Sequence, residues 1–156
     1  MSDEEFMRRA IDVSRERMLA GEGGPFGAVI VRGNQIIATG WNRVTSTNDP
    51  TAHAEVVAIR RACEAVGDFS LTGSTIYTSC EPCPMCLAAI HWARIDRIVF
   101  ANTRADAARI GFDDAMIYDE IPKPIDQRLI PTEHMSVPEA GDVFEMWLRK
   151  VDKIAY

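Results

Sequence analysis

The sequence predicts an α/β protein, a three-layer α/β/α sandwich with a mixed central sheet. Two observations predict it: two β-branched runs joined by Gly33-Asn34 near the start, and later short β-rich runs that alternate with segments of helical period. The chain has 156 residues, of which 47% are hydrophobic and 26% charged. This length and composition are typical of a single globular domain, so we expect residues 1–156 to form one domain.

The first half of the chain predicts a helix, a hairpin and a second helix. Apolar residues recur at helical spacing over residues 3–20, and the glycines of GEGG end that helix. The runs FGAVIVR (26–32) and QIIATGWN (35–42) flank Gly33-Asn34, which is a hairpin signal. TSTNDPT then reads as a loop.

A second helix is expected to follow this loop. Asp49-Pro50 looks like an N-cap followed by proline at the first helical position. This helix should run to about Ala65 and stop before Gly67.

The second half predicts two more strands, three more helices and a connector. We expect a strand at 74–79, a helix from Pro84 to Trp92, a strand at 97–101, a short helix at 104–110, a connector at 112–131 and an amphipathic helix at 137–152. The connector holds three prolines and no clear period.

The charge balance and the absence of an apolar span narrow the functional classes. The net charge of −6 weighs against nucleic acid as the main partner, because phosphate binding draws on a basic surface. No run approaches the roughly 18 apolar residues that a membrane span needs. The N-terminus is acidic and amphipathic, unlike a secretory signal. We therefore expect a cytoplasmic protein with a small-molecule substrate and no membrane partner.

Two cysteines that flank a helix start predict a metal site. Cys83 and Cys86 are three residues apart, so their sulfurs share one face of the first turn. Pro84 is tolerated there because its missing N–H would be unpaired in any case. The positive end of the helix favours thiolates, which zinc requires.

His53 offers a third ligand for the same ion, and Glu55 a proton carrier. Three protein ligands leave one position for water, which is the arrangement of catalytic zinc sites. Glu55 lies two residues beyond His53, where it can reach that water. Two thiolates and an imidazole cancel the charge of zinc, so a nearby carboxylate must take the proton from the water. HAE at 53–55 with PCPMC at 82–86 matches a pattern already known from zinc deaminases.

Other cysteines and histidines have simpler interpretations. The main alternative is a structural zinc site that Cys80 completes; otherwise Cys80 is a buried thiol at a strand end. Cys63 follows the core pattern of the second helix. His91 and His134 belong to no ligand pattern, and we expect them at the surface or in packing.

The motifs together resemble the cytidine deaminase-like superfamily. The segments that carry the resemblance are PFGAVIV, DPTAHAEVVAIR, TSCEPCPMCLAAIHWAR and IGFDD. Within the superfamily the chain looks most like the bacterial guanine deaminases, from the first helix to the final tyrosine. The resemblance implies one Zn²⁺ per subunit and hydrolysis of guanine to xanthine and ammonia. It also implies a homodimer that exchanges a C-terminal segment, about 121–156.

The resemblance also implies roles for individual residues. It matches His53, Cys83 and Cys86 to the zinc ligands and Glu55 to the catalytic proton shuttle. It matches a further set to substrate binding: Asn42, Asp114, Phe26, Trp92 and Tyr156. From the residues alone, Asp114 reads as a cap or a solvated acid, Tyr156 as a frayed terminus, and the other two aromatics as core. An Asn with donors and an acceptor, beside an Asp with acceptors only, suits guanine better than adenine.

Three other functions fit the same motifs. The first is a guanosine or aminotriazine deaminase of the same fold. The second is a tRNA adenosine deaminase. The negative net charge and the FDD motif argue against this alternative. The third is a non-catalytic module that zinc stabilises.

Overall fold

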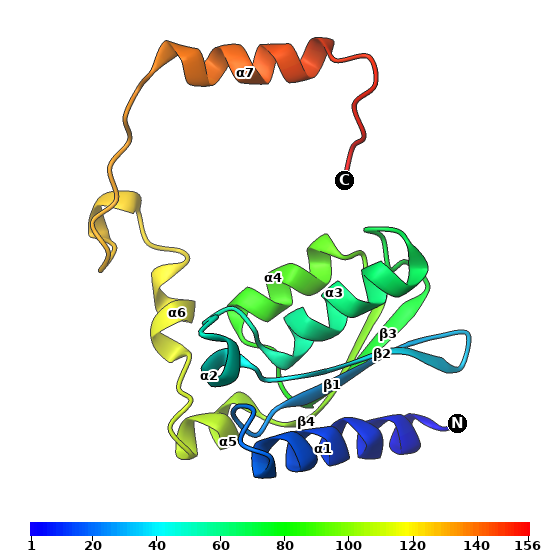
Figure 1. The fold of residues 1–156 in the computed structure, drawn as a ribbon. Coiled ribbons are helices and arrows are strands. Elements are labelled where there is room, and N and C mark those ends of the chain that lie inside the picture. The colour runs from blue at the N-terminus through cyan, green and yellow to red at the C-terminus, as the bar shows by residue number, and fades with distance from the viewer. The chain divides into compact units, whose positions relative to one another are not determined.

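The computed structural model describes residues 1–156, which divide into two units, Met1–Asp114 and Ala115–Tyr156. The first unit holds the sheet and the helices that pack on it (Figure 1). None of the helices is both long and apolar enough to cross a bilayer.

The sheet has four strands in the order β2-β1-β3-β4. They span Gly27–Arg32 (β1), Gln35–Trp41 (β2), Ser74–Cys80 (β3) and Arg97–Asn102 (β4). β1 runs antiparallel to β2 and to β3, whereas β3 and β4 are parallel, so the sheet is mixed. Gly33 and Asn34 both have positive φ, 55° and 64°, as the tight turns favoured in hairpins require. The predicted hairpin is therefore confirmed.

Helices cover both faces of this sheet. α1 (Asp3–Leu19) packs on one face, where Phe6 and Ala10 meet Val29 and Val31 of β1. α3 (Ala54–Val66) and α4 (Pro84–Trp92) cover the other face, as Figure 1 shows.

The alternation of side chains along β1 separates the two apolar clusters. Val29 and Val31 face α1, while Ala28 and Ile30 face the cluster that includes α3 and α4. One apolar cluster therefore lies on each face of the sheet, between the sheet and the helices that cover that face. This arrangement confirms the predicted three-layer α/β/α sandwich.

The loop between β2 and α3 differs from the sequence prediction. A short helix, α2 (Val44–Thr47), occupies part of the expected loop. Asp49 does not cap the next helix: its Oδ1 accepts hydrogen bonds from the backbone N and the Oγ1 of Thr51, at 2.9 and 2.6 Å. Asp49 thereby stabilises a turn. α3 begins at Ala54, with His53 as its N-cap, and ends at Gly67 in the left-handed conformation.

The later elements confirm the final helix and correct the connector. α5 (Arg104–Arg109) follows β4, and α7 (Pro138–Arg149) is the amphipathic helix expected at 137–152. The segment interpreted as an irregular connector contains α6 (Ala115–Glu120) and a 3-10 turn, Ile125–Gln127. No residue of Ala115–Tyr156 is buried, so α6 has no core-facing stripe from which the sequence could have predicted it.

Candidate metal centre

His53, Cys83 and Cys86 lie together at the N-termini of two helices. His53 is the N-cap of α3, Cys83 is the N-cap of α4, and Cys86 follows in the first turn of α4. Their ligand atoms all lie within 4.8 Å of one another.

The spacing of these atoms fits zinc. The Nδ1 of His53 lies 3.4 Å from the Sγ of Cys86 and 3.6 Å from the Sγ of Cys83. Tetrahedral zinc with ordinary Zn–N and Zn–S bonds separates its nitrogen and sulfur ligands by about 3.6 Å. The donor set and its geometry therefore fit a zinc ion with three protein ligands.

The electrostatics of the two sulfurs favour metal binding. A hydrogen bond from Cys86, with help from His53, lowers the pKa of Cys83 to about 4, so Cys83 is a thiolate at neutral pH. The same bond and burial raise the pKa of Cys86. In return, the hydrogen bond with Cys83 raises the pKa of His53. A divalent cation supplies the positive charge that a second thiolate needs here.

Glu55 lies directly beside this position. Its side chain is buried, and its Oε2 lies 3.4 Å from the Sγ of Cys86. Burial raises the pKa of the Glu55 carboxyl, so the carboxyl is suited to carry a proton.

Thr78 is a neighbour of Glu55 that sequence reasoning missed. Its Oγ1 donates to the backbone oxygen of Cys80 at 2.8 Å and lies 3.4 Å from Oε1 of Glu55. A hydroxyl has one hydrogen, so Thr78 donates to only one of these two acceptors at a time, the backbone oxygen of Cys80 or the carboxylate of Glu55. Thr78 lies among other hydroxyl residues of β3 (Ser74, Thr75 and Ser79), four positions before PCPMC begins, so no pattern in the sequence distinguishes it.

Cys80 does not join the metal ligands. Burial raises the pKa of the Cys80 thiol to about 11, and its Sγ approaches the backbone oxygen of Thr103 at 3.8 Å. The group that could hold a metal consists of His53, Cys83 and Cys86 alone. Cys63 packs beside the core, and His91 and His134 are exposed, as expected.

Asn42 is held at the end of β2 with its amide orientation determined. Its Oδ1 accepts hydrogen bonds from the backbone N–H groups of Gly24, at 3.2 Å, and Val44, at 3.1 Å. Two donors aimed at one atom identify that atom as the oxygen. The oxygen is therefore used internally, and only the NH₂ group is left to donate.

Gly23 allows this arrangement. A Cβ at Gly23 would lie 2.1 Å from the backbone oxygen of Asn42, so no larger residue fits.

Asp114 lies within the electrostatic reach of the metal position. Its carboxylate pairs with the Nε of Arg104 at 3.5 Å. Burial raises the pKa of Asp114; Arg104 opposes this effect, and the charges on Cys83 and Glu81 add to it. The charge of Cys83 thus acts on Asp114, although 31 positions separate the two residues in the sequence.

Phe26 packs edge-to-face on Phe112, with 4.9 Å between the ring centroids and 89° between the planes. This contact joins the segment before β1 to the GFDD motif. Phe112 was not among the predicted site residues, because an isolated phenylalanine in a polar segment gives no pattern.

The two other predicted aromatic residues, Trp92 and Tyr156, have exposed side chains. Trp92 ends α4, about 12 Å along the helix from Pro84, and its side chain is 63% exposed. Tyr156 ends the second unit, and its side chain is exposed. Their roles in substrate binding stay predictions.

Comparison with known proteins assigns the class of this protein. The family model described as the cytidine and deoxycytidylate deaminase zinc-binding region matches residues 1–102, and the chain belongs to this family. The predicted superfamily and the predicted zinc cofactor are confirmed.

Relatives narrow the class further. The guanine deaminase of Bacillus subtilis is 50% identical over 156 residues, which cover 100% of both chains. Its crystal structure covers 100% of this chain and 99% of its own, with a TM-score of 0.98. A solved guanine deaminase from Nitrosomonas europaea is 29% identical, covers 80% of this chain and 69% of that chain, and has a TM-score of 0.69. The tRNA-specific adenosine deaminase of Haemophilus influenzae is 40% identical over 118 residues, 72% of this chain and 68% of that protein.

Proposed function

We propose that this protein is a zinc-dependent aminohydrolase that converts guanine and water to xanthine and ammonia. The observation that carries the proposal is the match to a guanine deaminase along the whole chain, at 50% identity. The match to a tRNA-specific adenosine deaminase covers 72% of the chain, at lower identity. A non-catalytic module is disfavoured, because three ligands leave zinc an open position and a buried acid lies beside it.

Glu55 is the proton carrier in this reaction. Zinc, when bound, supplies a Lewis acid that makes water nucleophilic at neutral pH. Glu55 accepts a proton from the water that attacks C2, the carbon that bears the amino group. Glu55 then delivers that proton to the ring nitrogen beside C2. A second proton, from the new hydroxyl group on C2, passes through Glu55 to the amino group, which leaves as ammonia while C2 becomes a carbonyl carbon. Burial of the carboxyl supports this role, because it favours the protonated state that must form midway.

Asn42 and Asp114 are the proposed residues for purine recognition, with Phe26 as an apolar wall. The oxygen of Asn42 is already hydrogen-bonded, so Asn42 donates to an acceptor of the purine. Asp114 accepts from N–H groups at the guanine edge. This division refines the expectation that Asn42 would act as both donor and acceptor.

A substrate screen tests the proposal. Purified protein with one zinc per chain should release ammonia from guanine much faster than from guanosine, adenine, cytosine, cytidine or aminotriazines. Comparable weak activity on all of these would contradict guanine as the substrate. Tight binding of tRNA in a filter assay, with no turnover of guanine, would favour the tRNA adenosine deaminase alternative.

We further propose a homodimer that exchanges C-terminal segments, with Tyr156 closing the purine site. The second unit supports this proposal because it lacks a buried core: α7 exposes Val143, Phe144, Trp147 and Leu148. An apolar helix face without a core needs a covering surface. The prolines of IPKPID, residues 121–126, give a stiff connector of the kind that favours exchange. Light scattering should give twice the chain mass, and Phe144→Ser should shift it toward the monomer, whereas the exposed-face change Glu139→Gln should not.

The proposed compartment is the cytoplasm. All four cysteines are free, as in proteins of reducing compartments, and two of them are needed as metal ligands. Fractionation of cells that express the tagged chain tests this proposal.

A further inference from the structure

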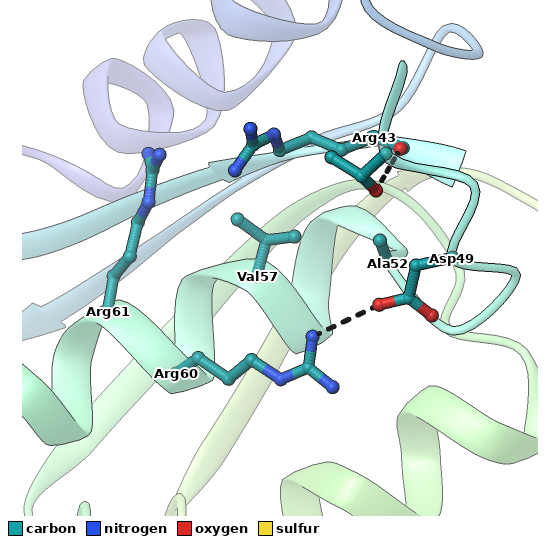
Figure 2. Close-up of a pocket in the computed structure, with 7 residues that line it drawn as sticks. Arg43, Asp49, Ala52, Val57, Arg60 and Arg61 are labelled. Atoms are coloured by element: carbon teal, nitrogen blue, oxygen red, sulfur yellow. Dashed lines mark hydrogen bonds and ion pairs between the residues drawn. The ribbon is translucent and has the colours of Figure 1, made fainter. Parts of the chain in front are cut away.

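We infer that a cavity separate from the metal ligands binds an oxyanion of the phosphate class. The cavity has a volume of about 320 Å³ and lies between the α2 loop and α3. It is lined by Arg43, Thr47, Asp49, Ala52, Val57, Arg60 and Arg61. Figure 2 shows the arginine side chains arranged around Val57.

The cavity carries an excess of positive charge in an acidic protein. The chain has a net charge of −6, yet three arginines and a single carboxylate line this space. That carboxylate, Asp49, pairs with Arg60 at 3.5 Å (Figure 2). Arg43 and Arg61 form no direct ion pair; the carboxylates that act on Arg61 from outside the lining are Glu22 and Glu64, and Glu22 also interacts with Arg43.

Arg43 also has an unsatisfied donor. Its Nε is buried and has no hydrogen-bond partner. Such an unpaired buried donor is rare in folded proteins. Because the Nε is shielded from solvent, an oxyanion in the cavity contacts the terminal nitrogens of Arg43 and offsets the charge of the guanidinium.

Arg61 is held in place beside this donor. Its guanidinium stacks 4.1 Å from the centroid of Trp41, and its Nη1 donates to the backbone oxygen of Thr39 at 3.1 Å. Arg17 lies 4.1 Å from the same ring centroid and pairs with Glu22 at 2.9 Å. Burial and the charges of Arg43 and Arg17 lower the pKa of Arg61, while Glu22 and Glu64 oppose this effect.

The chemistry of the lining selects the ligand. Guanidinium groups are planar and form paired hydrogen bonds with phosphate oxygens. The hydroxyl of Thr47 already donates to the backbone oxygen of Arg43 at 2.7 Å, so the arginines are the donors. Val57 and Ala52 add apolar walls. The cavity has room for inorganic phosphate or for the phosphate of a nucleotide, and the phosphate group is the shared chemistry.

Calorimetry with inorganic phosphate, AMP and adenosine, at constant ionic strength, tests the inference. Wild-type protein should bind phosphate with a Kd on the order of 1 mM or below. Arg43→Gln and Arg61→Gln should each weaken binding about tenfold or more, and Arg43→Lys should fall between wild type and Arg43→Gln. Arg8→Gln is the matched control, because Arg8 is exposed on α1 and pairs with Glu4 away from this cavity. Stronger binding of AMP than of phosphate identifies a nucleotide ligand, whereas the reverse order identifies the free ion; adenosine should not bind.

A second measurement needs no variant and covers the case in which a substitution prevents folding. Phosphate should slow modification of Arg43 and Arg61 by phenylglyoxal in wild-type protein, and it should leave Arg8 unaffected. The inference fails if wild-type protein binds no phosphate at roughly 10 mM. It fails equally if the glutamine variants bind as wild type does, or if phosphate protects all three arginines to the same extent.

Discussion

The Oε2 of Glu55 lies 3.4 Å from the Sγ of Cys86, so the proposed proton carrier touches a proposed ligand of the zinc. Glu55 belongs to α3 and Cys86 to α4, and the contact exists because both helices point their N-termini at one place. Two positive helix ends at one point stabilise both thiolates and an acid that must ionise during the reaction.

Glu55→Gln should keep the zinc and lose the activity. The amide is nearly the same size as the carboxyl but cannot shuttle a proton, so kcat should fall about 10²- to 10⁴-fold. Metal analysis should still find one zinc per chain. Near-normal turnover with zinc in place would remove Glu55 from the mechanism.

The two serine variants Cys83→Ser and Cys80→Ser separate an open metal site from a closed one. Cys83→Ser removes a thiolate ligand, so zinc content and activity should both be lost. Cys80 bonds to the backbone oxygen of Thr103, and Cys80→Ser should keep its zinc. Zinc release from Cys80→Ser would instead support a structural site with four protein ligands.

Asn42→Asp tests the donor role of the Asn42 amide. The aspartate keeps an oxygen for the N–H groups of Gly24 and Val44, replaces the NH₂ donors by a second oxygen, and adds a negative charge at a buried position. A lost hydrogen bond to substrate costs about 1–3 kcal/mol, which lowers kcat/KM for guanine about 5- to 100-fold. Circular dichroism should show an unchanged fold. Unchanged kinetics would place substrate recognition elsewhere.

The acid sensitivity of stability should depend on Asp3. Its carboxylate accepts a hydrogen bond from Arg97 at 2.6 Å and another from Tyr77 at 2.6 Å. These bonds, that of Arg97 first, lower the pKa of Asp3 in the folded state. The stabilisation is therefore present above the unfolded value of about 3.9 and is lost as pH falls through the lower folded value. Urea unfolding should be measured from about pH 2 to neutral pH. As the pH falls, the free energy of unfolding should decline less steeply for Asp3→Asn than for wild type.

The same contact should limit stability in alkali through Tyr77. Burial, and then the bond to Asp3, raise the pKa of the Tyr77 hydroxyl. Its contribution is present below the unfolded value of about 10 and is lost as pH rises through the raised folded value. Tyr77→Phe cannot ionise, so its stability should lose this alkaline decline. An identical alkaline profile for the two proteins would contradict the assignment.

The local features of this protein could be predicted from its sequence because they depend on residues close together in the chain. The hairpin at Gly33-Asn34 needs two adjacent residues with positive φ, and the pair Cys83 and Cys86 needs one helical turn. The roles of His53 as a zinc ligand and Glu55 as a proton carrier could be predicted because both residues lie in one short motif, HAE.

The sequence prediction failed where distant contacts decide. Asp-Pro at residues 49–50 is a common start of a helix. In the structure Asp49 instead forms an Asx turn with Thr51, and α3 begins only at Ala54. Thr78, Phe112 and the arginine cavity gained their roles only when separate elements packed together. The residue pattern alone placed Trp92 in the core, which is wrong: Trp92 lies at the end of α4 with its side chain 63% exposed.

The sequence by itself determined the family and the class of reaction, and it predicted the metal ligands and the neighbouring acid. Only the tertiary structure decided which atoms those groups meet. Residues within about one helical turn are brought together by the local chain conformation. The contact between Glu55 and Cys86, and the cavity that Arg43 and Arg61 both line, depend instead on how the sheet and helices pack.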